Sequence, residues 1–244
     1  MGTGGEGLRR EGGLTVALST PEIRTDIQRV SPEVVAAAAG HPAAILADVA
    51  GRRGSLNGIV AMTPGIKMAG PAFTVEVRAG DNLMIHAAMA LARPGDVLVV
   101  DGKGDTSCAL IGALMMNGCK MLQLGGVVID GAVRDIVELR ELGFPVFARA
   151  INPNGPTKLV PGRINWPICA GGLSIAPGDL VVGDDDGVVV VERERAAALL
   201  PLADKKVAEE AKRLDDIRSK RALKPGWLDA SLRAAGLLRD GESL

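Results

Sequence analysis

The chain has 244 residues, 47% of them apolar, which is enough for one large domain or two small ones around a substantial core. Its net charge of −1 gives no electrostatic reason to expect nucleic acid or an anionic membrane as the main partner. No apolar run reaches the roughly 18 to 20 residues of a membrane span. The three cysteines lack the spacing of a metal site or a disulfide framework, so a reducing cytoplasm is the expected compartment.

The first half of the chain predicts alternating helices and strands. Residues 1–18 are rich in glycine, and we expect them to form a flexible leader. Ser31-Pro32-Glu33 is typical of a helix start, and this helix should end at Gly40. The other elements expected here are a helix over 43–49, a strand over 71–77, a helix capped by Asp81 that runs to Leu91, a central strand over 96–100, and a helix from Thr106 or Ser107 to about Leu122.

The second half predicts a similar alternation followed by a helical tail. The expected elements are a strand over 127–129, a helix opened by Arg134-Asp135 and running to Leu142, a strand over 145–148, a proline-rich irregular stretch over 151–172 that holds short strands or a subunit contact, a hairpin around Asp184–Gly187, and helices over 192–222 and 226–237. One α/β domain over residues 19–200 with a C-terminal helical extension over 201–244 is the simplest organisation.

The stretch over 126–135 carries the clearest chemistry. Its β-branched residues predict a short buried strand, which Asp130-Gly131 should break as a turn. Arg134 and Asp135 then lie at a strand-to-helix junction, where ligands bind in α/β folds. Arginine can clamp a carboxylate and aspartate can hold a hard divalent cation. A surface pair that caps the helix explains the same residues.

A second loop, Asp101–Asp105, follows the central strand. If the two strands are neighbours, both loops open at one edge of the sheet. A helix that began near Gly112 would then offer the free backbone amides of Gly112, Ala113, Leu114 and Met115 to a carboxylate, with Arg134 on its other side. This arrangement suits a 2-oxo acid, because Arg134 and a cation on Asp135 would stabilise the enolate formed when a carbon–carbon bond breaks.

Three segments together, GDTSCALIGALMM, GGVVIDGAVRD and PGDLVVGDDDGVVVV, resemble the RraA-like superfamily over roughly residues 31–200. That superfamily includes class II pyruvate aldolases that act on 4-hydroxy-4-methyl-2-oxoglutarate or 4-carboxy-4-hydroxy-2-oxoadipate and that also decarboxylate oxaloacetate. The resemblance implies a compact αββαα sandwich that assembles as a homotrimer or a homohexamer. It also implies a lyase that takes a small 2-oxo acid and uses Mg²⁺ or Mn²⁺.

Carried onto this chain, the resemblance places substrate binding at Gly112–Met115, the pyruvate-binding and catalytic arginine at Arg134, and the metal ligand at Asp135. One position departs from the pattern. The family has an acidic residue twenty-one positions before the arginine, where this chain has Ala113. In the family that carboxylate orients the water that takes the substrate hydroxyl proton. Decarboxylation needs no such base, so we expect it to be at least as fast as aldol cleavage. Glu210 is a weak match to a glutamate that enters a neighbouring subunit's site in some relatives.

Other residues and functions have simpler or competing interpretations. We expect His41 to form a turn or cap, His86 to lie in a core or interface, and Cys108 to be a small apolar residue. Lys103 and Asp105 either border the pocket or are solvated. The alternative functions are a non-catalytic RraA-like regulator that binds a protein and, with less support, a methyltransferase. The methyltransferase would use the glycine-rich loop after the strand over 96–100, where the nucleotide fingerprint is poor.

Overall fold

A computed structural model describes residues 22–221 and 223–244, so the predicted leader over 1–18 lies outside the described residues. Its helices are α1 Pro32–Ala38, α2 Ala43–Val49, α3 Leu83–Leu91, α4 Ala113–Met121, α5 Ile136–Leu142, α6 Arg193–Arg218 and α7 Leu228–Ala234. Its strands are β1 Val60–Ala61, β2 Met68–Glu76, β3 Val97–Ile111, β4 Gly126–Val133, β5 Val146–Ile151, β6 Arg163–Ile164, β7 Ile168–Ala170, β8 Leu173–Ile175, β9 Leu180–Asp184 and β10 Gly187–Val191.

The main sheet has the strand order β1-β5-β4-β3-β2-β9-β10, and β6 pairs with β2. Strands β2, β3, β4 and β5 are parallel, which places their carboxyl ends at one edge of the sheet. Strand β3 lies between β2 and β4 and its first residues, Val97–Val100, are fully buried, as the apolar run predicts for a central strand.

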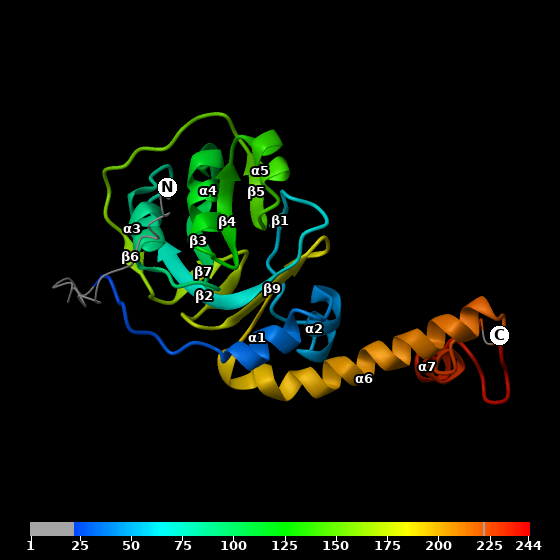
Figure 1. The fold of residues 1–244 in the computed structure, drawn as a ribbon. Coiled ribbons are helices and arrows are strands. Elements are labelled where there is room, and N and C mark those ends of the chain that lie inside the picture. The colour runs from blue at the N-terminus through cyan, green and yellow to red at the C-terminus, as the bar shows by residue number, and fades with distance from the viewer. Residues whose placement is uncertain (1–21, 222) are drawn as a thin grey trace, which may run out of the picture.

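The layers follow the order helices, strands, strands, helices (Figure 1). Helices α3, α4 and α5 pack on one face of the parallel strands through side chains such as Ile85, Met116 and Leu139. The opposite face packs against β7–β10, and α1, α2 and α6 cover the outer side of β9 and β10. The α/β sandwich expected from the sequence is therefore confirmed.

The helix expected from Thr106 or Ser107 is wrong in its first part. Residues 106–111 continue β3, and α4 begins at Ala113 with Gly112 as its N-cap. The backbone of this segment bonds to the stretch after β5: Asn152 donates to the Thr106 carbonyl, and the Ala109 amide donates to the Asn154 carbonyl. These long-range bonds satisfy the backbone without a helix, which local sequence preference cannot show.

The predicted turn at Asp130-Gly131 is also wrong, because β4 continues through both residues to Val133. Its pairing with β5 shifts between Ile129 and Ala132, so the irregularity is a bulge rather than a chain reversal. The Asp130 carboxylate makes an ion pair with Arg149 and accepts a bond from the Gly171 amide, instead of closing a local turn.

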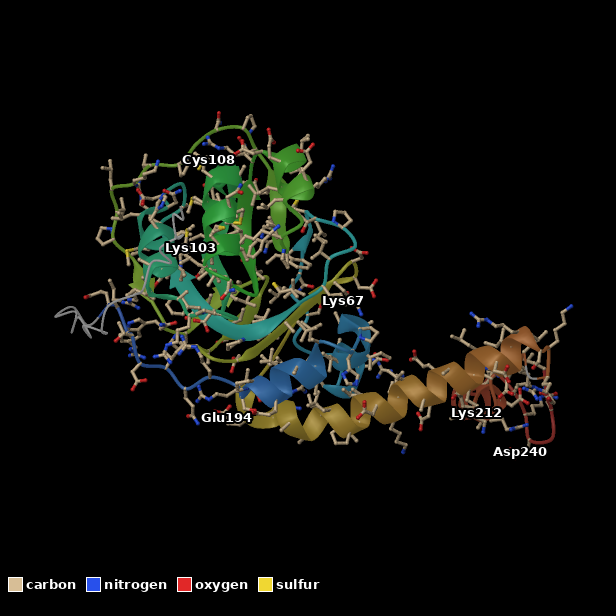
Figure 2. All side chains as sticks on the ribbon, in the orientation of Figure 1. Lys67, Lys103, Cys108, Glu194, Lys212 and Asp240 are labelled. Carbon is tan, nitrogen blue, oxygen red and sulfur yellow. The ribbon has the colours of Figure 1, made fainter. Side chains whose placement is uncertain are left out.

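Helix α6 leaves the body of the protein, and α7 lies near its far end (Figure 1). Residue 200, where the sequence suggests a boundary, falls inside α6. We call α6 together with α7 and the residues that follow it the arm. Lys212 and Asp240 lie in its far part, away from the sheet (Figure 2). Among the described residues, none of the helices is both long and apolar enough to span a bilayer.

Candidate functional site

The proposed site lies where two neighbouring parallel strands end. The last paired residues are Ile111 of β3 and Val133 of β4, and the Arg134 amide donates to the Ile111 carbonyl at 3.1 Å. Gly112 follows the first strand and Asp135 follows the second, so the sheet itself brings them together. The carboxyl edge of a parallel sheet is the usual place for a ligand in such folds.

Asp135 has a left-handed backbone conformation, with φ 59° and ψ 44°, which is uncommon for residues other than glycine, although aspartate adopts it more readily than most. It occupies the N-cap position of α5, yet its side chain makes no capping bond there. Instead, Oδ2 accepts a hydrogen bond of 2.9 Å from the Ala113 amide at the start of α4. The simpler interpretation, in which the pair caps its own helix, is therefore wrong for Asp135. Its other oxygen, Oδ1, makes no hydrogen bond with any residue from 22 to 221 or from 223 to 244.

Arg134 lies beside this carboxylate, with Nε 3.8 Å from Asp135 Oδ2 and 44% of its side chain exposed. A distance of 3.8 Å is too long for a hydrogen bond. Within the described chain, the guanidinium has no other side-chain partner. Two glycines leave room for it: a Cβ at Gly112 would lie 3.2 Å from Nε, and a Cβ at Gly155 would lie 3.0 Å from Nη1. The donors of Arg134 are thus available to a ligand.

The predicted row of free amides is only partly free. The Ala113 amide is taken by Asp135, and the Met115 amide donates to the Gly112 carbonyl at 3.1 Å. In the described structure, the Gly112 and Leu114 amides have no acceptor. Leu114 has an exposed side chain, so its amide lies at the mouth of the site. These two amides and Arg134 remain as donors for an anion.

These residues share a cavity of about 190 Å³. Its walls come from the end of β3, the start of α4, the β4–α5 junction, helix α3 and the stretch after β5. The lining residues are Asn82, His86, Ala109, Leu110, Ile111, Gly112, Leu114, Met115, Arg134, Asp135, Pro156 and Lys158. The predicted site residues Gly112, Leu114, Met115, Arg134 and Asp135 therefore lie together, and Ala113 contributes its amide to Asp135. Their chemical roles stay predictions.

Asn82 forms a buried part of the wall and is only 3% exposed. Its Nδ2 donates to the Leu110 carbonyl at 2.8 Å and approaches Met115 Sδ at 3.4 Å, which fixes the orientation of the amide. Its Oδ1 is buried without a hydrogen-bond partner. Such an acceptor is unfavourable unless a ligand or a water supplies a donor.

Asp81 holds the upper wall of the cavity in place. Its carboxylate accepts bonds from the Leu83 amide at the start of α3, from Thr157 Oγ1 at 2.6 Å, and from the Leu159 and Val160 amides. Burial alone would raise the pKa of Asp81, but these donors outweigh it and lower the pKa to about 2. Asp81 is thus a charged clamp that ties α3 to the segment carrying Lys158.

The sequence did not predict three of the residues that line the cavity: Asn82, His86 and Lys158. The prediction that His86 lies in a core or interface is wrong as regards the core, because its side chain is exposed at the cavity. The only local signal was the spacing of Asn82 and His86, four residues apart and hence on one face of a helix. Lys158 comes from a loop whose position depends on Asp81.

Other predicted features have structural roles. His41 contacts the Ala37 carbonyl at 3.1 Å and Asp204 at 3.0 Å, so it joins the end of α1 to α6, as expected of a cap. Lys103 bonds to Glu76 and Asp101 and does not line the cavity. Burial and the nearby Asp105 raise the pKa of the Cys108 thiol, which suits an unreactive residue.

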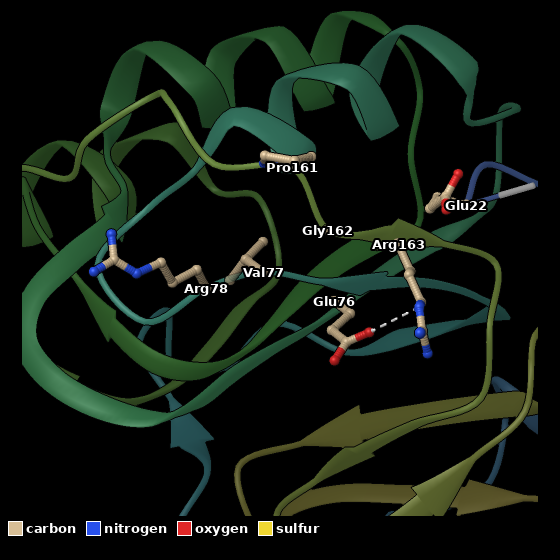
Figure 3. Close-up of a pocket in the computed structure, with 7 residues that line it drawn as sticks. All are labelled: Glu22, Glu76, Val77, Arg78, Pro161, Gly162 and Arg163. Atoms are coloured by element: carbon tan, nitrogen blue, oxygen red, sulfur yellow. Dashed lines mark ion pairs between the residues drawn. The ribbon is translucent and has the colours of Figure 1, made fainter. Parts of the chain in front are cut away.

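A second hollow, of about 420 Å³, lies at the end of β2, and Figure 3 shows its lining residues. Although this hollow is larger, Glu76 and Arg163, which line it, are already paired. Glu76 contacts Lys103 Nζ at 2.9 Å and Arg163 Nε at 3.9 Å, and Arg163 also lies 5.2 Å from the ring of Trp166. In the smaller cavity, within the described residues, the Arg134 guanidinium and the buried Asn82 Oδ1 have no hydrogen-bonded side-chain partner, so it is the better candidate site.

Asp184–Asp186 form the tight hairpin that their sequence predicts. Gly187 pairs with Asp184 across β9 and β10, so Asp185 and Asp186 make a two-residue turn. The Asp184 carboxylate accepts bonds from the Ala43 and Asp186 amides. Nowhere in the described residues do three or more histidine, cysteine or acidic side chains gather as a metal cluster.

With the fold and site described, comparison with known proteins gives the class. The family model RraA-like (Aldolase/RraA) matches residues 31–190, and the chain belongs to this family. It is 42% identical to a Halalkalibacterium halodurans protein named putative 4-hydroxy-4-methyl-2-oxoglutarate aldolase. The aligned region is 166 residues long and covers 65% of this chain and 79% of the relative.

Two solved structures extend the similarity to the fold. An uncharacterised protein from Pseudomonas syringae superimposes with a TM-score of 0.71 at 28% identity, covering 79% of this chain and 96% of that one. RraAS2 of Streptomyces coelicolor, described as an unusual member of the RNase ES inhibitor RraA family, has a TM-score of 0.68 at 32% identity, covering 77% and 99%. The family thus contains proteins named as aldolases and proteins named as ribonuclease inhibitors.

Proposed function

We propose that this protein is a divalent-metal-dependent lyase that cleaves a carbon–carbon bond of a 2-oxo acid and releases pyruvate. The observation that carries this proposal is the Arg134 guanidinium. It lies 3.8 Å from the Asp135 carboxylate and is hydrogen-bonded to no other described side chain, in a small cavity at the carboxyl edge of the sheet. The aldolase name of a relative that is 42% identical supports the same reaction class.

The residues of the cavity suit a small dianion. The Gly112 and Leu114 amides and Arg134 would bind the carboxylate and keto oxygen at one end of the substrate. Lys158, on another wall, would bind a second carboxylate. As the bond breaks, negative charge develops on the keto oxygen. Arg134 would stabilise this charge, because its donors make no hydrogen bond to a side chain of the described residues and remain available to the keto oxygen.

A divalent cation fits the site through Asp135. Oδ1 of this residue is without a hydrogen bond in the described structure, and its side chain is 38% exposed and lines the cavity. Mg²⁺ commonly binds through one or two carboxylates and keeps several waters, so a single aspartate is an adequate protein ligand for Mg²⁺ or Mn²⁺. When bound, the cation would supply Lewis acidity toward the keto oxygen.

Two reactions share this chemistry: aldol cleavage of a 4-hydroxy-2-oxo diacid, and decarboxylation of oxaloacetate. Both leave the enolate of pyruvate, but only the first requires removal of a hydroxyl proton. Ala113 provides no carboxylate for that step, so we propose that decarboxylation is at least as fast as cleavage. We also propose that the protein works in the cytoplasm.

Assembly as a homotrimer or homohexamer is part of the proposal. It is supported by large apolar side chains exposed along the arm, such as Leu202, Leu214 and Trp227. Glu210 lies on the same helix, contacts Lys206 at 3.5 Å, and does not line the cavity of its own chain. Its entry into a neighbouring subunit's site stays a prediction.

The test is a coupled assay of pyruvate release from oxaloacetate and from 4-hydroxy-4-methyl-2-oxoglutarate, run with Mg²⁺, with Mn²⁺, and after chelation. We expect turnover of both substrates, lost on chelation and restored by either metal. A protein that releases no pyruvate from either substrate at any metal concentration contradicts the proposal.

The second candidate is a non-catalytic regulator, and the similarity to RraAS2 favours it. That function predicts that Mg²⁺ or Mn²⁺ leaves ligand affinity unchanged, because no step would use a cation at Asp135. Calorimetric titration with oxalate, with and without metal, separates the two candidates. The methyltransferase has less support, because Gly102 and Gly104 lie inside β3 and not at the strand-to-helix turn that a nucleotide site uses.

A further inference from the structure

Aldol cleavage requires a group that removes the proton of the substrate hydroxyl, and the cavity offers few choices. Its titratable side chains are His86, Arg134, Asp135 and Lys158. An arginine stays protonated, and a lysine is ordinarily protonated at neutral pH. Asp135 is the one carboxylate that this part of the described chain contributes to the lining, and it is held by the Ala113 amide next to Arg134.

On the basis of the function proposed above, we propose that His86 is the proton-transfer residue for aldol cleavage, acting through a water in the cavity. Imidazole suits this role because it can both accept and donate a proton near neutral pH. His86 lies on α3, is exposed, and lines the cavity that contains Arg134 and Asp135. The protein's other histidine, His41, joins α1 to α6.

Asn82 supplies the second, independent observation. It lies one helical turn before His86, and both side chains line the cavity. Its amide nitrogen is committed to Leu110 and Met115, while the buried Oδ1 lacks a donor. A ligand hydroxyl or a water that donates to Asn82 Oδ1 after a small movement of the wall would satisfy this acceptor beside His86. The proton path itself needs only a water in the cavity between the substrate hydroxyl and His86.

The step balances without an external reactant. The C4 hydroxyl proton passes to the water as the water passes a proton to His86, and the O–H electron pair becomes the C4 carbonyl bond. The C3–C4 bond breaks, and its electron pair forms the enolate, whose charge rests on the C2 oxygen beside Arg134. The imidazolium then returns the proton, through the same water, to C3. Pyruvate and a second carbonyl compound leave, and His86 is neutral again.

The experiment compares two reactions that share the enolate but differ in the hydroxyl proton. In His86→Ala and His86→Gln, we expect cleavage of 4-hydroxy-4-methyl-2-oxoglutarate to fall by about 10² to 10³-fold. Oxaloacetate decarboxylation and the affinity for oxalate, measured by calorimetry, should stay within about threefold. Added imidazole should restore part of the cleavage activity to His86→Ala, which a purely structural role for His86 would not allow. The matched control is His41→Gln, which should leave both reactions unchanged.

The outcomes separate this inference from the proposed function. Equal loss of both reactions in the His86 variants, or unchanged cleavage, overturns the role of His86 while the lyase stands. Absence of imidazole rescue also counts against direct proton transfer. A wild-type protein that decarboxylates oxaloacetate but never cleaves the hydroxy acid overturns the inference alone. A wild-type protein that releases no pyruvate from either substrate overturns both.

Discussion

The most informative perturbation of the site is one methyl group at Gly112. This residue has φ −151° and ψ −171°, an extended conformation that alanine adopts without strain. The added Cβ, however, would lie 2.3 Å from Asp135 Oδ2, 3.1 Å from Arg134 Cγ and 3.2 Å from Arg134 Nε. Side-chain carbons essentially never approach closer than 3.0 Å, so the Asp135 carboxylate must move by at least about 0.7 Å.

That displacement should strongly affect turnover at the site but only slightly affect the stability of the fold. It stretches the 2.9 Å bond from the Ala113 amide and shifts both Asp135 and Arg134 away from the ligand. A misplacement of about 1 Å in a reacting constellation can reduce turnover about 10²-fold, and we expect this loss in Gly112→Ala. Because water can replace much of the lost hydrogen bond, stability should fall by only about 1 kcal/mol, or about 2 to 4 °C in Tm.

The assay measures metal-dependent pyruvate release together with thermal unfolding of the same samples. Gly226→Ala is the matched control, because a Cβ there meets nothing within 4 Å, and both measurements should stay at wild-type values. Gly155→Ala should fall between the two, since its Cβ meets only the flexible end of Arg134 at 3.0 Å. If Gly112→Ala keeps turnover within about threefold of wild type, the position of the Arg134–Asp135 pair does not control the reaction.

Four further predictions follow from the same geometry. Arg134→Ala should lower turnover of both substrates by about 10³-fold, and turnover within tenfold of wild type would refute its role. Asp135→Ala should abolish the response to added Mn²⁺ in both turnover and calorimetric binding of the metal. Lys158→Ala should raise the KM for the hydroxy diacid about tenfold while leaving the Kd for pyruvate nearly unchanged, as expected if it binds only the second carboxylate. Asp81→Asn should destabilise the protein by about 1 to 2 kcal/mol at pH 7. The pKa of Asp81 is about 2 in the folded protein, below its ordinary value of 3.8, so its stabilisation is complete above pH 3.8 and is lost as the pH falls from 3.8 to about 2. Urea unfolding curves of the two proteins should therefore converge over that range.

The sequence predicted the parts of the fold whose signals are local. The helix over Pro32–Ala38 has its capping serine and first-turn proline, and the Asp184–Gly187 hairpin has its turn residues. The apolar run over Val97–Val100 predicted a central strand because no other position buries both faces. In each case a few neighbouring residues determine the structure.

The sequence misled where distant segments satisfy the backbone. Thr106 and Ser107 are good helix-capping residues, yet the stretch after β5 bonds to them and β3 continues. Asp130-Gly131 is typical of a turn, yet the Asp130 side chain pairs with Arg149 and Gly171. Both errors come from contacts between residues far apart in the sequence, which override local preference.

The residues of the site also fall into two groups, those that local sequence predicts and those that only the fold brings together. Arg134 and Asp135 were predictable, because they follow a buried strand and the end of a parallel strand is a place for ligands. The wall that carries His86 and Lys158 was not predictable. From its sequence alone, His86 resembles any histidine in an apolar helix, and only the fold places it at the cavity. The position of Lys158 depends on Asp81, which lies 77 residues earlier in the chain than Lys158 and holds the segment around it.

Three unusual features converge on this one cavity. Asp135 has a left-handed backbone, Arg134 has a guanidinium without a hydrogen-bonded partner in the described structure, and Asn82 has a buried acceptor without a donor. The buried acceptor of Asn82 and the left-handed backbone of Asp135 are each destabilising, and a protein selected only for stability would gain by removing either of them. The Arg134 guanidinium is half-exposed and hydrated, so its donors carry no such penalty but are free for a ligand. A bound keto acid engages two of the three features together, since its oxygens accept from Arg134 and its hydroxyl or an ordered water supplies the donor that Asn82 lacks. A non-catalytic regulator that binds a protein partner has no such use for the cavity, so the combination favours the enzyme.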